Sequence, residues 1–224
     1  MSFTHVQGTG AFPGTVTTAT VTMGAAPGLH HIVCFALNLA TTTVTGVTVA
    51  DTNGNTYTLT PHSPESNGLG GNTYLAYLLS APSNAAAGIT ASWTTASPCS
   101  IWADEFSWIG LQPTFDTDIG AGGTGGTVNT PSITPTYPNS LLYSACGSSG
   151  TITAPTAGGT LGVWTGSAAG VLDGDMAEYD LSASAATAVN YTQGATDIWS
   201  AMAMSFSQLQ PGGGAYRIPV FWMG

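Results

Sequence analysis

The chain has 224 residues, of which one is Lys or Arg and 11 are Asp or Glu, so its formal net charge is -10. Charged residues make up 5% of the chain, against about 25% in an ordinary soluble domain. Phosphate backbones and anionic membrane surfaces are bound by clusters of Lys and Arg. We therefore expect neither nucleic acid nor a membrane as a partner. No apolar run reaches the roughly 20 residues of a membrane-spanning helix.

The chain is predicted to begin with an N-terminal arm at 1–14, followed by a domain at 15–210. Residues 1–7 have neither the basic region nor the apolar segment of a secretory signal peptide. The composition is nevertheless rich in Thr, Gly and Ala and poor in Lys, as in extracellular proteins. A virion protein, made in the cytoplasm and released by lysis, would reconcile these observations. We expect a virion location, with the cell surface or the extracellular space as the alternative.

Runs of β-branched and aromatic residues, bounded by turn signals, predict strands throughout the domain. The predicted strands are 15–23, 29–39, 44–50, 56–60, 73–79, 89–94, 100–109, 141–146, 161–164, 176–181, 188–192 and 198–206. A tight turn is predicted at 51–55, because Asn53-Gly54 lies between two such runs. No stretch has sustained helical periodicity. The fold class is therefore all-β, an antiparallel β-sandwich or jelly roll.

A Gly-rich segment at 120–136 is interpreted as a crossover between two halves, 15–119 and 137–210. It matches the spacing G-x-G-x-x-G, but no helix follows, so a dinucleotide site is rejected. The halves share two short echoes in matching order. The first is Tyr77-Leu78-Leu79-Ser80-Ala81 with Tyr179-Asp180-Leu181-Ser182-Ala183. The second is Ser100-Ile101-Trp102, followed by Phe106-Ser107, with Asp197-Ile198-Trp199, followed by Phe206-Ser207. Both an internal duplication and two similar strand pairs would produce them.

The C-terminal segment 211–224 is predicted to be a hydrophobic arm. It begins with a Gly-rich joint at 212–214 and then carries several large apolar side chains, which a monomer would not leave in water. The residues expected to mediate assembly are Tyr216, Arg217, Ile218, Val220, Phe221 and Trp222. Arg217 is the one cation of the chain. It is predicted to pair with a carboxylate on a neighbouring subunit or on the sandwich edge, fixing where the arm docks.

No pattern predicts catalysis. The adjacent acids Asp104 and Glu105 point to opposite faces of a strand, and we expect one at the surface and the other hydrogen-bonded. Asp173, Asp175 and Glu178 are a weak candidate for Ca²⁺, because carboxylate oxygens suit that ion, although their spacing does not match an EF-hand. No other metal and no cofactor is expected.

The remaining titratable residues also give no site. The rings of His30 and His31 are expected to diverge at the start of a strand, without a second pair at zinc-ligand spacing. The three cysteines, Cys34, Cys99 and Cys146, are read as small buried residues. One disulfide plus a free thiol remains an alternative.

The order of motifs in the first half resembles a broad group of β-sandwich domains from tailed-phage structural proteins and bacterial surface proteins. The motifs are Ala25-Ala26-Pro27-Gly28, the apolar strand at 31–37, the stretch at 47–57, Tyr74-Leu75-Ala76-Tyr77, and the strand from Trp102 to Gly110. The resemblance covers roughly residues 10–210. It implies a sandwich with a structural or adhesive role, and it implies no catalytic residues.

We therefore predict a non-enzymatic structural protein of a virion, a self-assembling capsid decoration or accessory protein. Its partners would be copies of itself and other structural proteins of the assembly. One alternative is a carbohydrate-binding or adhesive module that uses exposed Trp or Tyr, so a glycan is a second candidate partner. The other alternative is an extracellular filament subunit.

Overall fold

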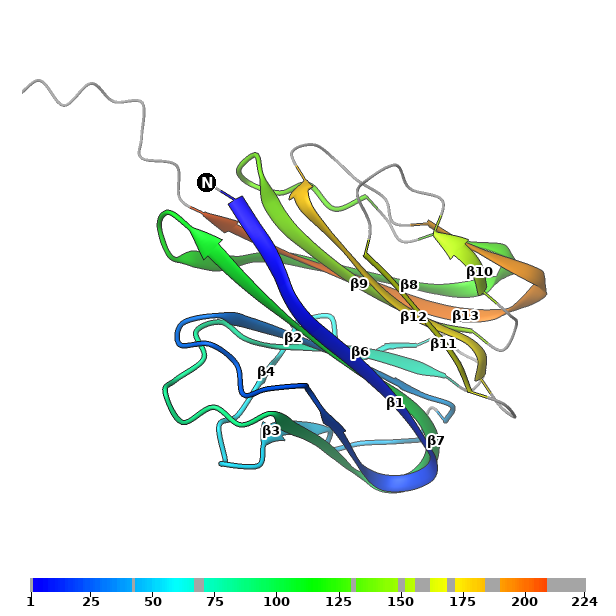
Figure 1. The fold of residues 1–224 in the computed structure, drawn as a ribbon. Coiled ribbons are helices and arrows are strands. Elements are labelled where there is room, and N and C mark those ends of the chain that lie inside the picture. The colour runs from blue at the N-terminus through cyan, green and yellow to red at the C-terminus, as the bar shows by residue number, and fades with distance from the viewer. Residues whose placement is uncertain are drawn as a thin grey trace, which may run out of the picture.

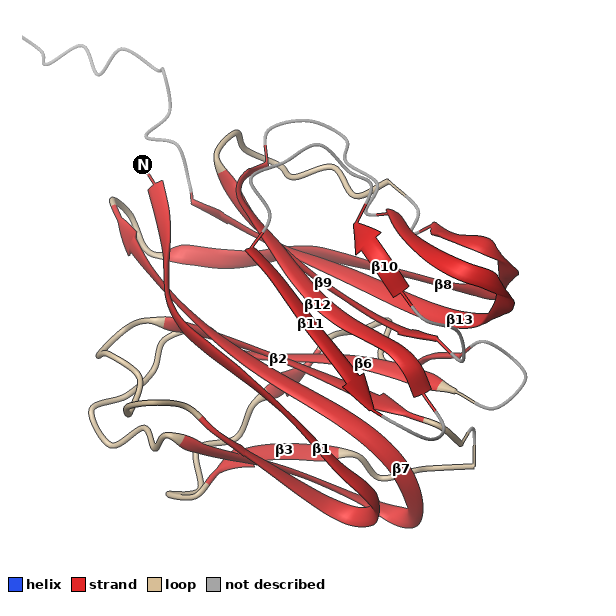
Figure 2. Cartoon of the chain, turned by 45° about the vertical axis from the view of Figure 1, so that its right-hand side comes forward, coloured by secondary structure: helices blue, strands red, loops and turns tan. Residues whose placement is uncertain are grey.

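The protein is an antiparallel β-sandwich, as predicted. A computed structural model describes residues 2–41, 43–66, 71–129, 132–148, 152–155, 162–168, 172–183 and 190–208. Within these residues the chain forms strands and loops, and no helix (Figure 2). The described part consequently holds no helix with the length and apolar character to cross a membrane. Two sheets pack face to face (Figure 1).

The first half of the chain forms the first sheet. Its strands are β1 (Ser2–Thr22), β2 (Ile32–Leu39), β3 (Thr48–Asp51), β4 (Thr58–Leu59), β5 (Glu65–Ser66), β6 (Asn72–Leu78) and β7 (Gly88–Ile109). They lie in the order β1-β7-β2-β6-β4, while β3 pairs with β7 and β5 pairs with β6. The strand β7 is long enough to serve two sets of neighbours, β3 along its first part and β2 along its second part.

The second half forms the second sheet. Its strands are β8 (Pro113–Asn129), β9 (Ser140–Ser148), β10 (Ile152–Pro155), β11 (Gly162–Ala168), β12 (Leu172–Ala183) and β13 (Asn190–Gln208). They lie in the order β10-β13-β9-β12-β11, and β8 pairs with the other side of β13. Short connections and antiparallel pairs allow each half of the chain to build its own sheet.

The two sheets repeat one strand order. In the first sheet β1 pairs with β7, then β2, β6 and β4 follow, and β3 pairs with β7. In the second sheet β8 pairs with β13, then β9, β12 and β11 follow, and β10 pairs with β13. Each half is therefore the same unit of strands, and equivalent strands succeed one another in the same order along the chain.

The strand registers extend this equivalence to individual residues. Ile32 pairs with Phe106, and Leu141 pairs with Phe206. Cys34 pairs with Tyr77, and Tyr143 pairs with Tyr179. The backbone conformation supports the same equivalence. Among the described residues, the non-glycine residues with positive φ are His30 at 65° and Asn139 at 60°. His30 lies two residues before Ile32, and Asn139 lies two residues before Leu141. These correspondences favour an internal duplication over a chance similarity.

The first sequence echo and the second part of the other echo lie at equivalent positions. Tyr77 corresponds to Tyr179, and Phe106 corresponds to Phe206. The first part of the second echo is out of register: the residue equivalent to Trp102 is Met202, not Trp199, because Trp102 pairs with Ala36 and Met202 pairs with Ala145.

The sandwich core lies between equivalent faces of the two sheets. It contains Phe3, Ile32, Cys34, Ala36, Leu75, Trp102, Phe106, Leu141, Tyr143, Ala145, Met202, Met204 and Phe206. A separate apolar cluster covers the other face of the first sheet, where β3 and the first part of β7 pack over β2 and β6. A third cluster, which includes Ile133 and Trp199, covers the other face of the second sheet. The two halves thus meet like the subunits of a two-fold dimer, each using the same face.

Two predicted boundaries are wrong. Residues 2–14 are no arm, because they are part of β1 and pair with β7 from the register Ser2↔Ile109 onward. The Gly-rich segment was predicted to be a crossover at 120–136. Its part up to Asn129 belongs instead to β8, which pairs with β13. The chain passes from one sheet to the other at 110–112. The predicted strand pairs 89–94 with 100–109, and 188–192 with 198–206, are each one continuous strand.

The C-terminal segment from residue 209 onward lies outside the described residues, and with it all six residues predicted to mediate assembly. The backbones of the calcium candidates Asp173, Asp175 and Glu178 lie in β12. The predicted turn at 51–55 is confirmed: Gly54 N donates to Asp51 O, and Gly54 has a φ of 86°.

Candidate functional site at one end of the sandwich

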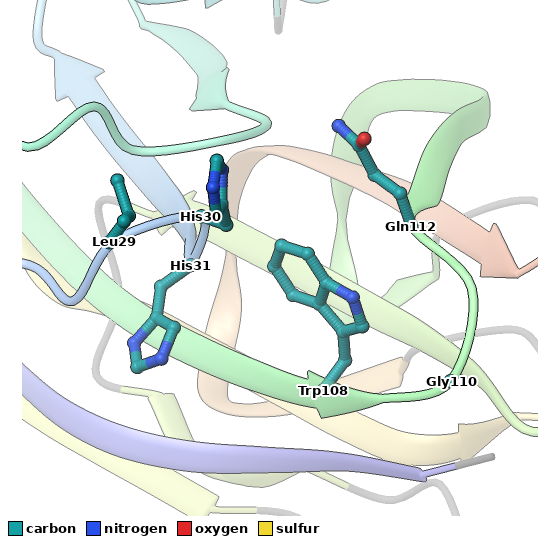
Figure 3. A pocket seen from close by; sticks show the side chains of 6 residues that line it. All are labelled: Leu29, His30, His31, Trp108, Gly110 and Gln112. Atoms are coloured by element: carbon teal, nitrogen blue, oxygen red, sulfur yellow. The ribbon is translucent and has the colours of Figure 1, made fainter.

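A pocket opens at one end of the sandwich, where the chain enters β2 and leaves β7. Its volume is about 410 Å³. We call it the end pocket, and its lining consists of Leu29, His30, His31, Trp108, Gly110 and Gln112 (Figure 3). These residues come from the two loops that precede β2 and β8 and from the end of β7.

The loop before β2 holds the two histidines in different directions, as predicted. His30 has a left-handed backbone, and its Nδ1 lies 3.0 Å from Ser80 Oγ. His31 Nδ1 lies 2.5 Å from a Glu105 carboxylate oxygen. Backbone hydrogen bonds of 2.8 Å between this loop and Ala81 fix the segment on the neighbouring chain. In Figure 3 the two rings diverge and the Trp108 indole stands between His30 and Gln112.

Trp108 lies at the mouth of the inter-sheet core. Side chains alternate along a strand, so Trp108 shares the inner face of β7 with Trp102 and Phe106. It is half-buried and packs against the inter-sheet cluster. Its equivalent in the second half is Gln208, which pairs with Pro113, next to the pocket residue Gln112. The end of the inter-sheet layer therefore carries an indole from one sheet and an amide from the other.

Gln208 is a buried polar group with unmet hydrogen bonds. It is 3% exposed, and neither its Nε2 nor its Oε1 has a partner. A buried amide without partners costs about 1–3 kcal/mol. Nearby, an aromatic cluster closes the core: Tyr77 stacks on Phe115 at 4.9 Å between ring centroids, and Phe206 meets both rings edge-on. Polar and aromatic groups thus gather at this end of the sandwich.

Asp104 and Glu105 occupy the middle of β7, and the expectation that one of them lies at the surface is wrong. Both are 1% exposed. Asp104 accepts hydrogen bonds from Tyr143 at 3.1 Å and lies 2.9 Å from His5 Nε2. On the opposite face, Glu105 accepts from Gly28 N at 2.7 Å, besides its contacts with Gln7 and His31. Each carboxylate is held by several partners, which sequence spacing could not reveal.

Burial shifts the pKa of two groups in this region, Asp104 and Cys34. It raises the pKa of Asp104, against the opposing effects of His5 and Tyr143. Burial also raises the pKa of the Cys34 thiol well above its usual value, and the adjacent Asp104 charge adds to the effect. A thiol is a nucleophile only as the thiolate, so Cys34 is unsuited to that role although a histidine and a carboxylate lie nearby. All three cysteines are buried and none forms a disulfide, as the first interpretation predicted.

Other described carboxylates also hold the fold together. Asp51 accepts from Asn53 N, Asn55 N and Ala86 N at 2.9–3.0 Å, which organises the turn after β3. Asp118 accepts from the backbone and lies 2.9 Å from the ring of His62, so it joins the first half to β8. Among the described residues, no three His, Cys, Asp or Glu side chains gather as a metal site would require.

The free edges of the two sheets differ. β1 and β8 are equivalent first strands, and in the described part each pairs on one side alone. The pairing of β1 shifts register at three places along the strand. The pairing of β8 with β13 is regular from Thr117 to Gly125, and no charged residue or proline occurs between Ile119 and Asn129. Bulges, charges and prolines are what blunt an exposed sheet edge. The pairing of β8 shifts register on either side of this regular stretch, and Asp116 and Asp118 lie before Ile119. The stretch from Ile119 to Gly125 is therefore the part of β8 without these protective features.

Comparison of the chain with protein-family models, with curated proteins and with solved structures found no match.

Proposed function

We propose that the protein is a non-enzymatic, self-assembling structural protein, a decoration or accessory protein of a virion capsid. The regular, uncharged stretch of β8 from Ile119 to Gly125 is the observation that carries the proposal, because such an edge accepts a strand from another chain. The described carboxylates support a structural role too, since buried Asp104 and Glu105 are each tied to partners within the fold.

The strand donor in this proposal is the C-terminal segment of a neighbouring copy. Residues 215–224 contain Tyr, Ile, Val, Phe, Trp and Met side chains that need an apolar cover. Main-chain hydrogen bonds along β8 would hold the segment at the sheet edge. The segment also carries Arg217, and β8 carries Asp116 and Asp118, so opposite charges are available on the two partners.

The test is the mass of the particle in solution. Size-exclusion chromatography with light scattering should give a multiple of 22.5 kDa for the full chain. Thr124→Lys places a charge on the exposed edge of β8, and Arg217→Ala removes the cation, so both should lower the mass. Thr17→Lys, an exposed position on the equivalent strand β1, is the control and should leave the mass unchanged.

A monomeric wild-type protein at high concentration would contradict the proposal, as would edge variants that assemble like the wild type. Negative-stain microscopy then separates the two forms of assembly. Closed particles or decorated capsids agree with a virion protein, whereas unbranched fibres would favour the filament alternative.

A further inference from the structure

We propose that the end pocket binds a neutral saccharide, stacked on Trp108 and hydrogen-bonded by His30 and Gln112. This proposal is independent of assembly, because the pocket lies at the end of the sandwich and not along the edge of β8. A pocket of about 410 Å³ matches a site for one or two sugar rings.

The aromatic wall favours a sugar ring. Trp108 is half-buried, so its indole is fixed by packing while part of its surface remains accessible. A sugar offers a flat patch of C–H groups that packs on such a ring, as other amphipathic partners do. The exposed apolar residue Leu29 also lines the pocket.

The polar groups suit hydroxyls. The bond between His30 Nδ1 and Ser80 orients the ring and leaves Nε2 as the nitrogen that can bind a ligand. The Gln112 amide is exposed across the indole from His30 (Figure 3). An imidazole and an amide each both donate and accept, which is what a hydroxyl group requires. The unpartnered amide of Gln208 is buried behind the pocket, beside Pro113, and is not part of the lining.

Charge defines the ligand class. Among the described residues, no Lys, Arg, Asp or Glu lines the pocket, and the carboxylate that contacts its lining, Glu105, is buried and bonded to His31, Gly28 and Gln7. The net charge of -10 repels anions, so phosphorylated and acidic sugars are disfavoured. A ligand without polar groups would leave the imidazole and amide unsatisfied. A neutral saccharide meets both conditions.

The duplication supplies a comparison within the chain. The positions equivalent to His30, His31 and Trp108 are Asn139, Ser140 and Gln208. Ser140 Oγ bonds to Tyr137 O at 2.6 Å and to Ser207 Oγ at 2.8 Å, so this position is satisfied within the fold. The first half therefore carries an indole and two imidazoles where the same frame in the second half holds two amides and a hydroxyl. This difference is not needed to form the fold, which agrees with a ligand site.

The experiment uses the full-length chain. A glycan array containing neutral and acidic saccharides identifies the best ligand, and calorimetry with that saccharide measures its Kd. We expect a neutral ligand, a Kd of about 0.1–1 mM, and a loss of about tenfold in Trp108→Ala. Trp108→Phe keeps an aromatic ring and should recover part of the affinity. His30→Asn, which installs the residue of the equivalent position, should weaken binding about threefold.

Phe12→Leu is the control, because Phe12 is an exposed aromatic residue outside the pocket, and its ligand affinity should equal that of the wild type. Near-UV circular dichroism confirms the fold of every variant. The proposal is overturned if no neutral saccharide binds at millimolar concentration, if acidic saccharides bind more tightly, or if folded Trp108→Ala binds like the wild type. Repeating the titration with Thr124→Lys separates this result from any change in assembly.

Discussion

The two halves of the molecule share a frame but not a chemistry. Equivalent strands pair in the same order, and equivalent positions face the inter-sheet core. The first half places Cys34, Trp102 and Asp104 on that face, where the second half has Tyr143, Met202 and Met204. The strand order is thus preserved while the side chains that meet across the core have become different.

The difference reflects the packing of two faces into one interior. A close-packed core tolerates a large side chain only where the opposite surface leaves room. Tyr143 of the second half uses its hydroxyl to bond Asp104 of the first half. The core-facing side chains of the two halves are therefore complementary to each other and are no longer alike. Four predictions test how the two halves differ and what holds them together.

The largest effect is expected at Trp102. It is 1% exposed, and truncating a buried Trp costs about 3–5 kcal/mol. Met202→Ala, at the equivalent position, should cost about 2–3 kcal/mol because a smaller cavity remains. Urea unfolding of Trp102→Ala and Met202→Ala measures both free energies. Equal costs would contradict the view that the first half supplies the larger share of packing at this position.

A smaller effect is expected at Gly8, which corresponds to Asp118 in the second half. A Cβ at Gly8 would clash with Asp104 Oδ1 and lie 3.1 Å from His5 Nε2. Asp104 is buried and bonded, so it cannot give way without breaking its pair. Gly8→Ala should therefore cost about 2 kcal/mol by overpacking.

The matched control for Gly8→Ala is Gly126→Ala on the equivalent strand β8. A Cβ at Gly126 has no atom within 4 Å, so this variant should unfold within about 0.5 kcal/mol of the wild type. Chemical denaturation compares the two. If Gly8→Ala is as stable as Gly126→Ala, the close approach of β1 to Asp104 is not required.

The third prediction concerns the pH dependence at Asp104. Burial raises its pKa from 3.8, so the folded state holds the proton more tightly than the unfolded chain. Stability from this group therefore increases as the pH falls from 7 through the folded-state pKa, and levels off near 3.8. Asp104→Asn should cost about 1 kcal/mol at pH 7, and this cost should grow towards pH 4.

Asp51→Asn is the control with the opposite sign. Burial acts to raise the pKa of Asp51, but hydrogen bonds from Asn55, Ala86 and Asn53 together outweigh it and lower the pKa below 3.8. The wild type should have a larger free energy of unfolding than Asp51→Asn, and this difference should shrink only as the pH falls below 3.8. Thermal unfolding of both variants across this range gives the comparison, and parallel pH profiles would refute the assignment.

The sequence predicted the fold class because its alternating runs are local signals, and most strands were found from them. It missed β8, since glycines such as Gly120 and Gly123 carry no strand preference. Their small size is explained by contacts: a Cβ at Gly120 would lie 2.6 Å from Glu65, and one at Gly123 would lie 3.2 Å from Trp199. Those neighbours are distant in sequence, so no local pattern contains them.

The candidate site was less predictable than the fold. Trp108 lies within the predicted strand 100–109 and packs on the core, but its place at the open end depends on how β7 ends against β2 and β8. Gln112 carries no signal of its own, and the partner of His31 lies on another strand. Three of the histidines have a carboxylate partner, His5, His31 and His62, and none of these pairs is near in sequence.

The smallest effect is expected at His62, whose ring links the first half to Asp118 of β8. The His62 side chain is 55% exposed, and exposed ion pairs contribute about 0–1 kcal/mol. Backbone N–H of His62 also donates to Asp118 at 2.8 Å, so Asp118 keeps a partner when the ring is removed. His62→Ala should therefore cost about 0.5 kcal/mol in thermal unfolding. A cost above about 2 kcal/mol would mean that this link, rather than the apolar interface between equivalent faces, holds the halves together.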